Sequence, residues 1–173
     1  TKTGATTGNV SVQAFTNADF SGAIEVPGAA VAGTTYSYAI DLTRPLLIEG
    51  GALGDRIILD GDLGTAITLR GMHGTDQVVV MGKNAAGGSY VPGTNTANGL
   101  DGNTDLRGAI VIGSTTINFQ EFESGGSVTV RDLASFTFQT PLAADSLTFE
   151  SVAAGQNRVT GTSGGVQIVP MSF

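Results

Sequence analysis

The oxygen-bearing side chains of Asp101, Asn103 and Asp105 stand at alternate positions of the stretch Asp101-Gly102-Asn103-Thr104-Asp105. Calcium loops surround their ion with side-chain oxygens spaced in this way, because Ca²⁺ is a hard cation that prefers oxygen ligands. Leu106 occupies the next position, where such a loop requires glycine, and no glutamate follows where its last ligand is expected. Ca²⁺ is therefore the one candidate cofactor, and a polar turn held by local hydrogen bonds is the favoured alternative.

Residues suited to nucleophilic or histidine-based catalysis are few. His73 is the single histidine and cysteine is absent, so a Ser-His-Asp triad or a multi-histidine metal site would depend on this one residue. His73 lies in a glycine-flanked segment that reads as a turn. The sharpest enzymatic alternative is a β-helical polysaccharide lyase, which would use Arg70 or Arg107 as its base.

Paired carboxylates could hydrolyse glycosidic bonds, and Glu121 with Glu123, or Asp60 with Asp62, would share one face of a strand. Aromatic side chains that stack on sugar rings are scarce, because the chain has no tryptophan and three tyrosines. Most of its eight phenylalanines occupy positions typical of a core. We therefore expect that the chain is not an enzyme.

The charge balance argues against nucleic acid and anionic membranes as partners. The formal net charge is −7 and only eight residues are lysine or arginine, too few for a basic stripe that displaces counterions from phosphates. No apolar run approaches the roughly 18 residues that cross a bilayer, so no membrane insertion is expected. The chain begins at Thr1 without methionine, which indicates a processed and exported segment. We expect an extracellular or cell-surface location.

Short apolar triplets separated by Gly, Asp, Asn and Thr predict an all-β fold. Charged residues make up 13% of the chain, about half the usual share, so its surface must be built from Thr, Ser, Asn and Gly. The predicted strands centre on residues 46–48, 57–59, 67–69, 78–80, 110–112, 117–119, 128–130, 136–138, 147–149 and 166–168. Such regular spacing is typical of a β-sandwich, a barrel or a β-solenoid.

A degenerate repeat favours the β-solenoid, with a β-sandwich or jelly roll as the alternative. An Asp or Asn stands two residues before the first apolar residue of several strands, as Asp55, Asp76, Asp145 and Asn157 do. Such a residue turns the chain by bonding to nearby backbone. The spacings fit two short strands per coil of about 21–23 residues, in which equivalent side chains stack. Phe119, Phe138 and Phe149 are expected to form one such stack.

Two regions depart from the repeat. Residues 1–45 contain strand-like segments at 10–15 and 35–40 but no such Asp or Asn, which predicts an N-terminal β cap or a segment that docks on another subunit. Residues 46–173 form the predicted solenoid-like domain. Residues 83–108 are polar and glycine-rich, and they are expected to form a loop inserted into that domain.

Two family resemblances accompany these patterns. Gly71-Met72-His73-Gly74-Thr75-Asp76-Gln77-Val78-Val79 resembles the glycine-rich nonapeptide of RTX-type β-rolls, as Gly50-Gly51-Ala52-Leu53-Gly54-Asp55-Arg56-Ile57-Ile58 also does. These copies are not in tandem, so their aspartates are expected to form turns. Residues 46–169 resemble the degenerate β-solenoid repeats of large secreted bacterial surface proteins, including adhesins. The resemblance implies extracellular structural work.

Three functions follow as expectations. The first is a structural protein, either a self-assembling fibre or matrix subunit with itself as partner, or a structural segment of a giant surface protein. The second is an adhesin-type module that binds a surface glycan or a protein through residues 83–108. The lyase is the third and the least favoured.

Overall fold

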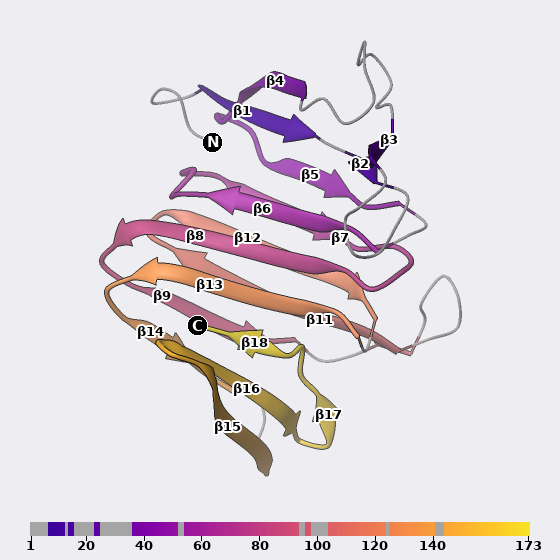
Figure 1. Cartoon of the computed structure of the whole chain (residues 1–173), viewed down its shortest axis with the longest axis vertical. Coiled ribbons are helices and arrows are strands. Elements are labelled where there is room, and N and C mark those ends of the chain that lie inside the picture. The colour runs from indigo at the N-terminus through magenta and orange to yellow at the C-terminus, as the bar shows by residue number, and fades with distance from the viewer. Residues whose placement is uncertain are drawn as a thin grey trace.

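The computed structural model describes residues 7–12, 14–15, 23–24, 36–51, 54–93, 96–97, 104–123, 125–140 and 144–173. These residues form an all-β fold without helix, which confirms the predicted fold class at this level. Two open seven-stranded sheets of mixed strand direction pack face to face (Figure 1). Two further pairs, β1 with β4 and β2 with β3, each form a two-stranded sheet.

Sheet I has the strand order β14-β9-β11-β12-β7-β5, with β10 added beside β11. Its strands are β5 (Leu46–Glu49), β7 (Ala66–Arg70), β9 (Gly88–Pro92), β10 (Thr96–Ala97), β11 (Thr104–Ile112), β12 (Thr115–Phe122) and β14 (Phe136–Phe138). Sheet II has the order β15-β16-β18-β13-β8-β6, with β17 beside β16. Its strands are β6 (Arg56–Asp60), β8 (Gln77–Ala85), β13 (Ser127–Leu133), β15 (Asp145–Ala153), β16 (Gln156–Ser163), β17 (Val166–Gln167) and β18 (Met171–Ser172).

Three repeats, each with one strand in either sheet, form the regular part of the fold. The first repeat contains β5 and β6, the second β7 and β8, and the third β12 and β13. Neighbouring repeats pair in parallel in both sheets, with Leu46 beside Ile67 in sheet I and Arg56 beside Gln77 in sheet II. The 21-residue step of the predicted repeat therefore relates the first two repeats. The regularity does not extend to Asp145, which lies on the antiparallel strand β15.

Between the second and third repeats the described residues lie mostly in strands, whereas the sequence predicts a loop over residues 83–108. In this stretch lie the end of β8, then β9, β10 and the start of β11. β9 and β11 pair antiparallel, and β11 then pairs antiparallel with β12, so the inserted strands extend sheet I beyond the third repeat. The sequence signal is weak here because few large apolar residues mark the inward face.

The ends of the stack differ. At one end, β1 (Thr7–Val12) pairs antiparallel with β4 (Tyr36–Asp41), which confirms that residues near 10–15 and 35–40 form strands. β2 (Ala14–Phe15) pairs with β3 (Ala23–Ile24). The β1–β4 pair lies beyond β5 (Figure 1). At the other end, β14 and the β15–β16 hairpin complete the two sheets.

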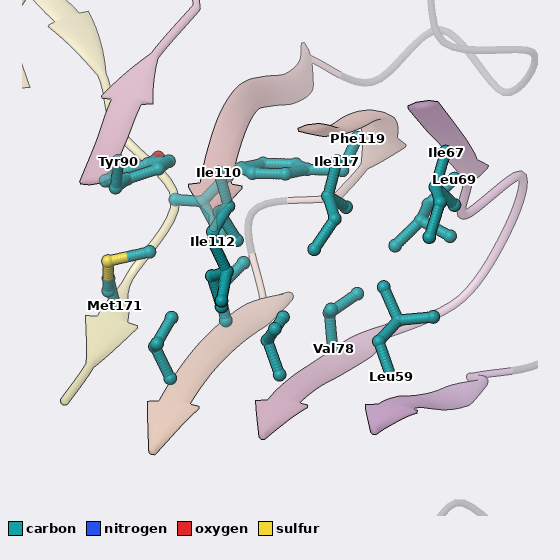
Figure 2. Packing of buried hydrophobic residues seen from close by; sticks show 14 of the residues in the cluster. Leu59, Ile67, Leu69, Val78, Tyr90, Ile110, Ile112, Ile117, Phe119 and Met171 are labelled. Carbon is teal, nitrogen blue, oxygen red and sulfur yellow. The ribbon is translucent and has the colours of Figure 1, made fainter. Parts of the chain in front are cut away.

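The core fills the space between the sheets. Inward side chains of sheet I and sheet II point toward one another, as Figure 2 shows for Ile67 and Ile117 opposite Leu59 and Val78. These four side chains are at most 5% exposed. Burial alternates along the strands, as in β12, so each strand contributes every second residue to the core.

An aromatic stack runs along the inward face of sheet I, and it contains the three predicted phenylalanines. Tyr90 lies between Phe119 and Phe138, with ring centroids 5.9 and 5.3 Å away. Phe149 from β15 meets Phe138 edge-on at 6.4 Å. The stack therefore crosses from sheet I to sheet II at the end of the molecule, and the buried Tyr90 supplies the member that the sequence pattern did not reveal.

Hydrogen bonds to the Asp62 carboxylate join the β11–β12 hairpin to the turn before β7. Its carboxylate accepts hydrogen bonds from the Thr115 hydroxyl (2.6 Å), the Ser114 backbone N–H (3.0 Å) and the Gly64 N–H (3.1 Å). Burial raises the pKa of Asp62, but the hydrogen bonds from Thr115, Ser114 and Gly64 outweigh it and hold the pKa below its usual value. The charged form of Asp62 therefore stabilises the β11–β12 hairpin.

Asp62→Ala should lower the free energy of unfolding at pH 7 by about 2 kcal/mol, because the donors of residues 64, 114 and 115 lose a charged acceptor. The stabilisation is fully present above the unfolded pKa of 3.8 and is lost as pH falls through the lower folded pKa, so the difference between wild type and variant should narrow as the pH falls below 3.8. Urea unfolding at pH 7 and at about pH 2 measures this. Asp60→Ala, which loses the half-exposed ion pair with Lys83, should cost less. An equal loss in both variants at pH 7 would contradict the role of Asp62.

Candidate functional site: an acidic corner

Three acidic side chains that act on one another lie where the chain passes from sheet I to sheet II. Each repeat makes this passage through a short corner, whose described residues are 50–51 with 54–55, 71–76, and 123 with 125–126. The corners stack through backbone hydrogen bonds: Gln77 N–H donates to the Asp55 carbonyl at 2.7 Å, and Ser127 N–H donates to the Asp76 carbonyl at 2.9 Å. We call the set Asp55, Asp76 and Glu123 the acidic corner.

Hydrogen bonds to backbone donors hold the three carboxylates. The Asp55 carboxylate accepts from Gly51 N–H in its own corner at 2.6 Å. The Asp76 carboxylate accepts from the backbone N–H of Asp55 in the preceding repeat at 2.8 Å. The Glu123 carboxylate accepts from Gly74 N–H at 2.9 Å. Asp55 therefore closes a turn, as the repeat predicts, whereas Asp76 and Glu123 each join their repeat to the one before.

Asp76 is the most deeply placed of these groups. It is 0% exposed, and its Oδ2 atom has no hydrogen-bond partner. Burial raises the pKa of Asp76 to about 7, since the negative charges of Glu123 and Asp55 add to the effect and the hydrogen bond from Asp55 N–H only partly offsets it. A carboxyl group in such surroundings holds its proton near neutral pH.

Two glycines give the carboxylates their space. A Cβ atom on Gly50 would lie within 3.0 Å of the Asp55 carboxylate and of the Gly71 carbonyl. A Cβ atom on Gly71 would meet the Asp76 carboxylate and the Glu121 carbonyl in the same way. Glycine is required at both positions by the close approach of the next repeat, and each stands five residues before its aspartate.

A second charged ladder lies where the outward residues of sheet I meet the corner. The Arg70 guanidinium contacts Glu49 of the first repeat at 2.7 Å and Glu121 of the third repeat at 2.6 Å. Its Nε also donates to Glu121 at 3.1 Å, so that pair is bidentate. Glu49, Arg70 and Glu121 thus alternate in sign across three repeats, and they tie the strand ends together.

The residues considered for catalysis each bond to other groups of the fold. Arg70 is engaged by two carboxylates, Glu121 bonds to Arg70, and Glu123 bonds to Gly74. Asp60 pairs with Lys83 and Asp62 with the β11–β12 turn. The carboxylate pairs Glu121 with Glu123 and Asp60 with Asp62 are therefore each divided between different partners.

The remaining candidates lie elsewhere. The backbone N–H of His73 donates to the Gly51 carbonyl at 3.3 Å. Arg107 lies on β11, away from Arg70 in the strand order of sheet I.

The candidate calcium ligands fall largely outside the described part of the chain. Asp101 and Asn103 lie outside it, and Asp105 is placed by its backbone in β11, where it pairs with Thr96. Within the ranges that the structure describes, no group of three or more His, Cys, Asp or Glu side chains is arranged to hold a metal ion. The same ranges contain no helix that is long and apolar enough to cross a membrane.

Comparison with known proteins adds no relative: no protein-family model, curated protein or solved structure matches this chain.

Sequence reasoning found Asp55 and Asp76 as turn residues but missed the burial of Asp76 and the approach of Glu123. The spacing Gly50-x₄-Asp55 and Gly71-x₄-Asp76 is a signal that could have indicated the shared geometry. Glu123 carries no such signal, because the third repeat reaches the corner only after the inserted strands.

Gly50→Ala should destabilise the fold by about 1–3 kcal/mol, because the added methyl group meets backbone of the next repeat. Gly51→Ala is the matched control, since its Cβ would lie 3.8 Å from the Asp55 carboxylate in ordinary contact. Thermal unfolding of the two variants measures the difference. Equal melting temperatures would show that the corners are not packed as closely as described.

Proposed function

We propose that this chain is an extracellular structural domain, built as a β-solenoid, that works by assembly and not by catalysis. The observation that supports the solenoid is the parallel, in-register stacking of three two-strand repeats in both sheets at once. A β-sandwich of antiparallel meanders does not need such a repeat. The ion-paired ladder and the acidic corner make contacts between repeats, which is a structural role.

The end of the stack formed by β14 and β15 supports a role in assembly. Both strands are outermost in their sheets, so each presents one open backbone edge. Inward side chains between them are incompletely covered: Phe138 and Leu147 are half-buried, and Phe149 is 60% exposed. Open strand edges beside exposed apolar side chains are sites where further strands pair.

Strand direction and register at this end match those of the first repeat. β14 runs in the same direction as β5, and β15 runs in the same direction as β6. In sheet I, the row of residues paired from strand to strand starts at Leu46 of β5 and ends at Phe138 of β14. In sheet II, the corresponding row starts at Ile57 of β6 and ends at Phe149 of β15. A second copy in the same orientation would therefore set apolar residues beside apolar residues in both sheets.

The partner we propose is a second copy of the chain, added end to end. Such a contact joins two different surfaces and leaves one of each open, so it generates a filament. β1 and β4 lie at the opposite end of the stack (Figure 1), where the N-terminal part of the chain would either dock on the preceding copy or cap the first repeat. If the chain is instead a structural segment of a larger surface protein, the end formed by β14 and β15 would pair with further repeats of that same protein.

Electron microscopy and sedimentation of the purified chain test the assembly, and Phe149→Lys tests the surface. Wild type should form filaments, and Phe149→Lys should abolish them because a charge would be buried between the copies. Thr148→Lys, whose side chain lies on the other face of the same strand, should retain them. Removal of residues 1–15 distinguishes a docking segment, which is required for filaments, from a cap. Monomers of wild type under all conditions would refute self-assembly and shift the proposal to a surface-protein segment or a glycan-binding module.

Calcium binding at Asp101, Asn103 and Asp105 is a separate proposal with its own test. Replacement of Asp101 and Asp105 by alanine should lower the melting temperature in calcium and leave it unchanged in chelator, because only the loaded site stabilises the fold. Differential scanning calorimetry with each additive measures the effect. A calcium response that is the same in wild type and in the double variant would remove the site.

A further inference from the structure

A fully buried carboxyl group is costly unless its charge is compensated, and the acidic corner offers Asp76 little compensation. One oxygen of Asp76 accepts the Asp55 N–H, and the other has no hydrogen-bond partner. The charged groups that act on it are Glu123 from the third repeat and Asp55 from the first, and both carry the same sign. Ionisation of Asp76 would therefore bury a negative charge beside two others.

We propose that Asp76 is a proton-dependent latch: its neutral carboxyl group lets the three repeats stack closely, and loss of its proton loosens the stack at the acidic corner. The latch lies at the place where backbone hydrogen bonds join all three repeats. It needs no ligand other than the proton. It is independent of whether the chain assembles.

The direction of the pH effect follows from linkage. Below about pH 4 the group is protonated in both the folded and the unfolded chain, and it does not affect stability. Between the ordinary pKa of 3.8 and the folded pKa of about 7, only the folded chain holds the proton, so stability falls as pH rises. Above about pH 7 the loss is complete. Asp41, Asp62 and Asp145, whose pKa values are lowered, act in the opposite direction and at lower pH.

Asp76→Asn tests the latch, because asparagine keeps an acceptor for the Asp55 N–H and cannot ionise. The unfolding equilibrium constant of wild type should rise by up to about tenfold per pH unit between pH 4.5 and 7, as one linked proton requires. The variant should lack this rise, so the two melting temperatures should diverge as pH increases. Measurements are made in chelator, which keeps metal ions out. Asp60→Asn, which alters a partly exposed carboxylate on the neighbouring strand β6, should show the same pH dependence as wild type.

Glu123→Gln provides a second test that does not alter Asp76. It keeps the acceptor for Gly74 N–H and removes one like charge, so the pH window should move down. The carboxyl ¹³C resonance of Asp76 gives a direct readout: titration near pH 7 in wild type and at lower pH in Glu123→Gln supports the latch. Titration of Asp76 near pH 4, or parallel pH profiles for wild type and Asp76→Asn, would overturn it.

Discussion

Close backbone stacking at the corners is the constraint on which the rest of the structure depends. Gly50 donates to the Arg70 carbonyl and Gly71 to the Gln120 carbonyl, so successive repeats are held at hydrogen-bond distance where the chain leaves sheet I. At this separation a side chain on either glycine would strike the next repeat. The corner therefore sets the register with which both sheets begin, and β8 and β13 keep this register as far as the pair of Met81 and Arg131.

The fixed register explains why the core side chains form continuous rows and why these rows stop at an uncovered end. Each inward residue lies beside an inward residue of the next strand, so branched aliphatic and aromatic side chains form continuous rows. A row built by repetition has no intrinsic stop, and here the rows end at Phe138 and Phe149 without a covering strand. At the opposite end lies the antiparallel pair of β1 and β4, which belongs to neither large sheet.

Local patterns predicted the strands well and the connections poorly. Short β-branched triplets located most strands, and Asp55 with Asp76 revealed the 21-residue step, because turn chemistry and alternation are local properties. Extending that step to Asp145 was wrong, since inserted strands and an antiparallel hairpin intervene. The strands within 83–108 form through pairing between distant segments, which no local pattern records. The same is true of the hydrogen bond from Ser114 N–H to Asp62. Tyr90 joined the aromatic stack for the same reason.

Repetition also places side chains of like charge next to one another, which is unfavourable. The outward ladder of Glu49, Arg70 and Glu121 and the acidic corner reduce this repulsion in different ways. On the outward ladder, Arg70 stands between Glu49 and Glu121, so opposite charges alternate along the stack. At the acidic corner the charges acting on Asp76 are both negative, and glycines leave room for the carboxylates but supply no cation. A neutral, protonated Asp76 is then the means by which three acidic residues can share one corner. The same close stacking that orders the fold thus makes its stability depend on a proton.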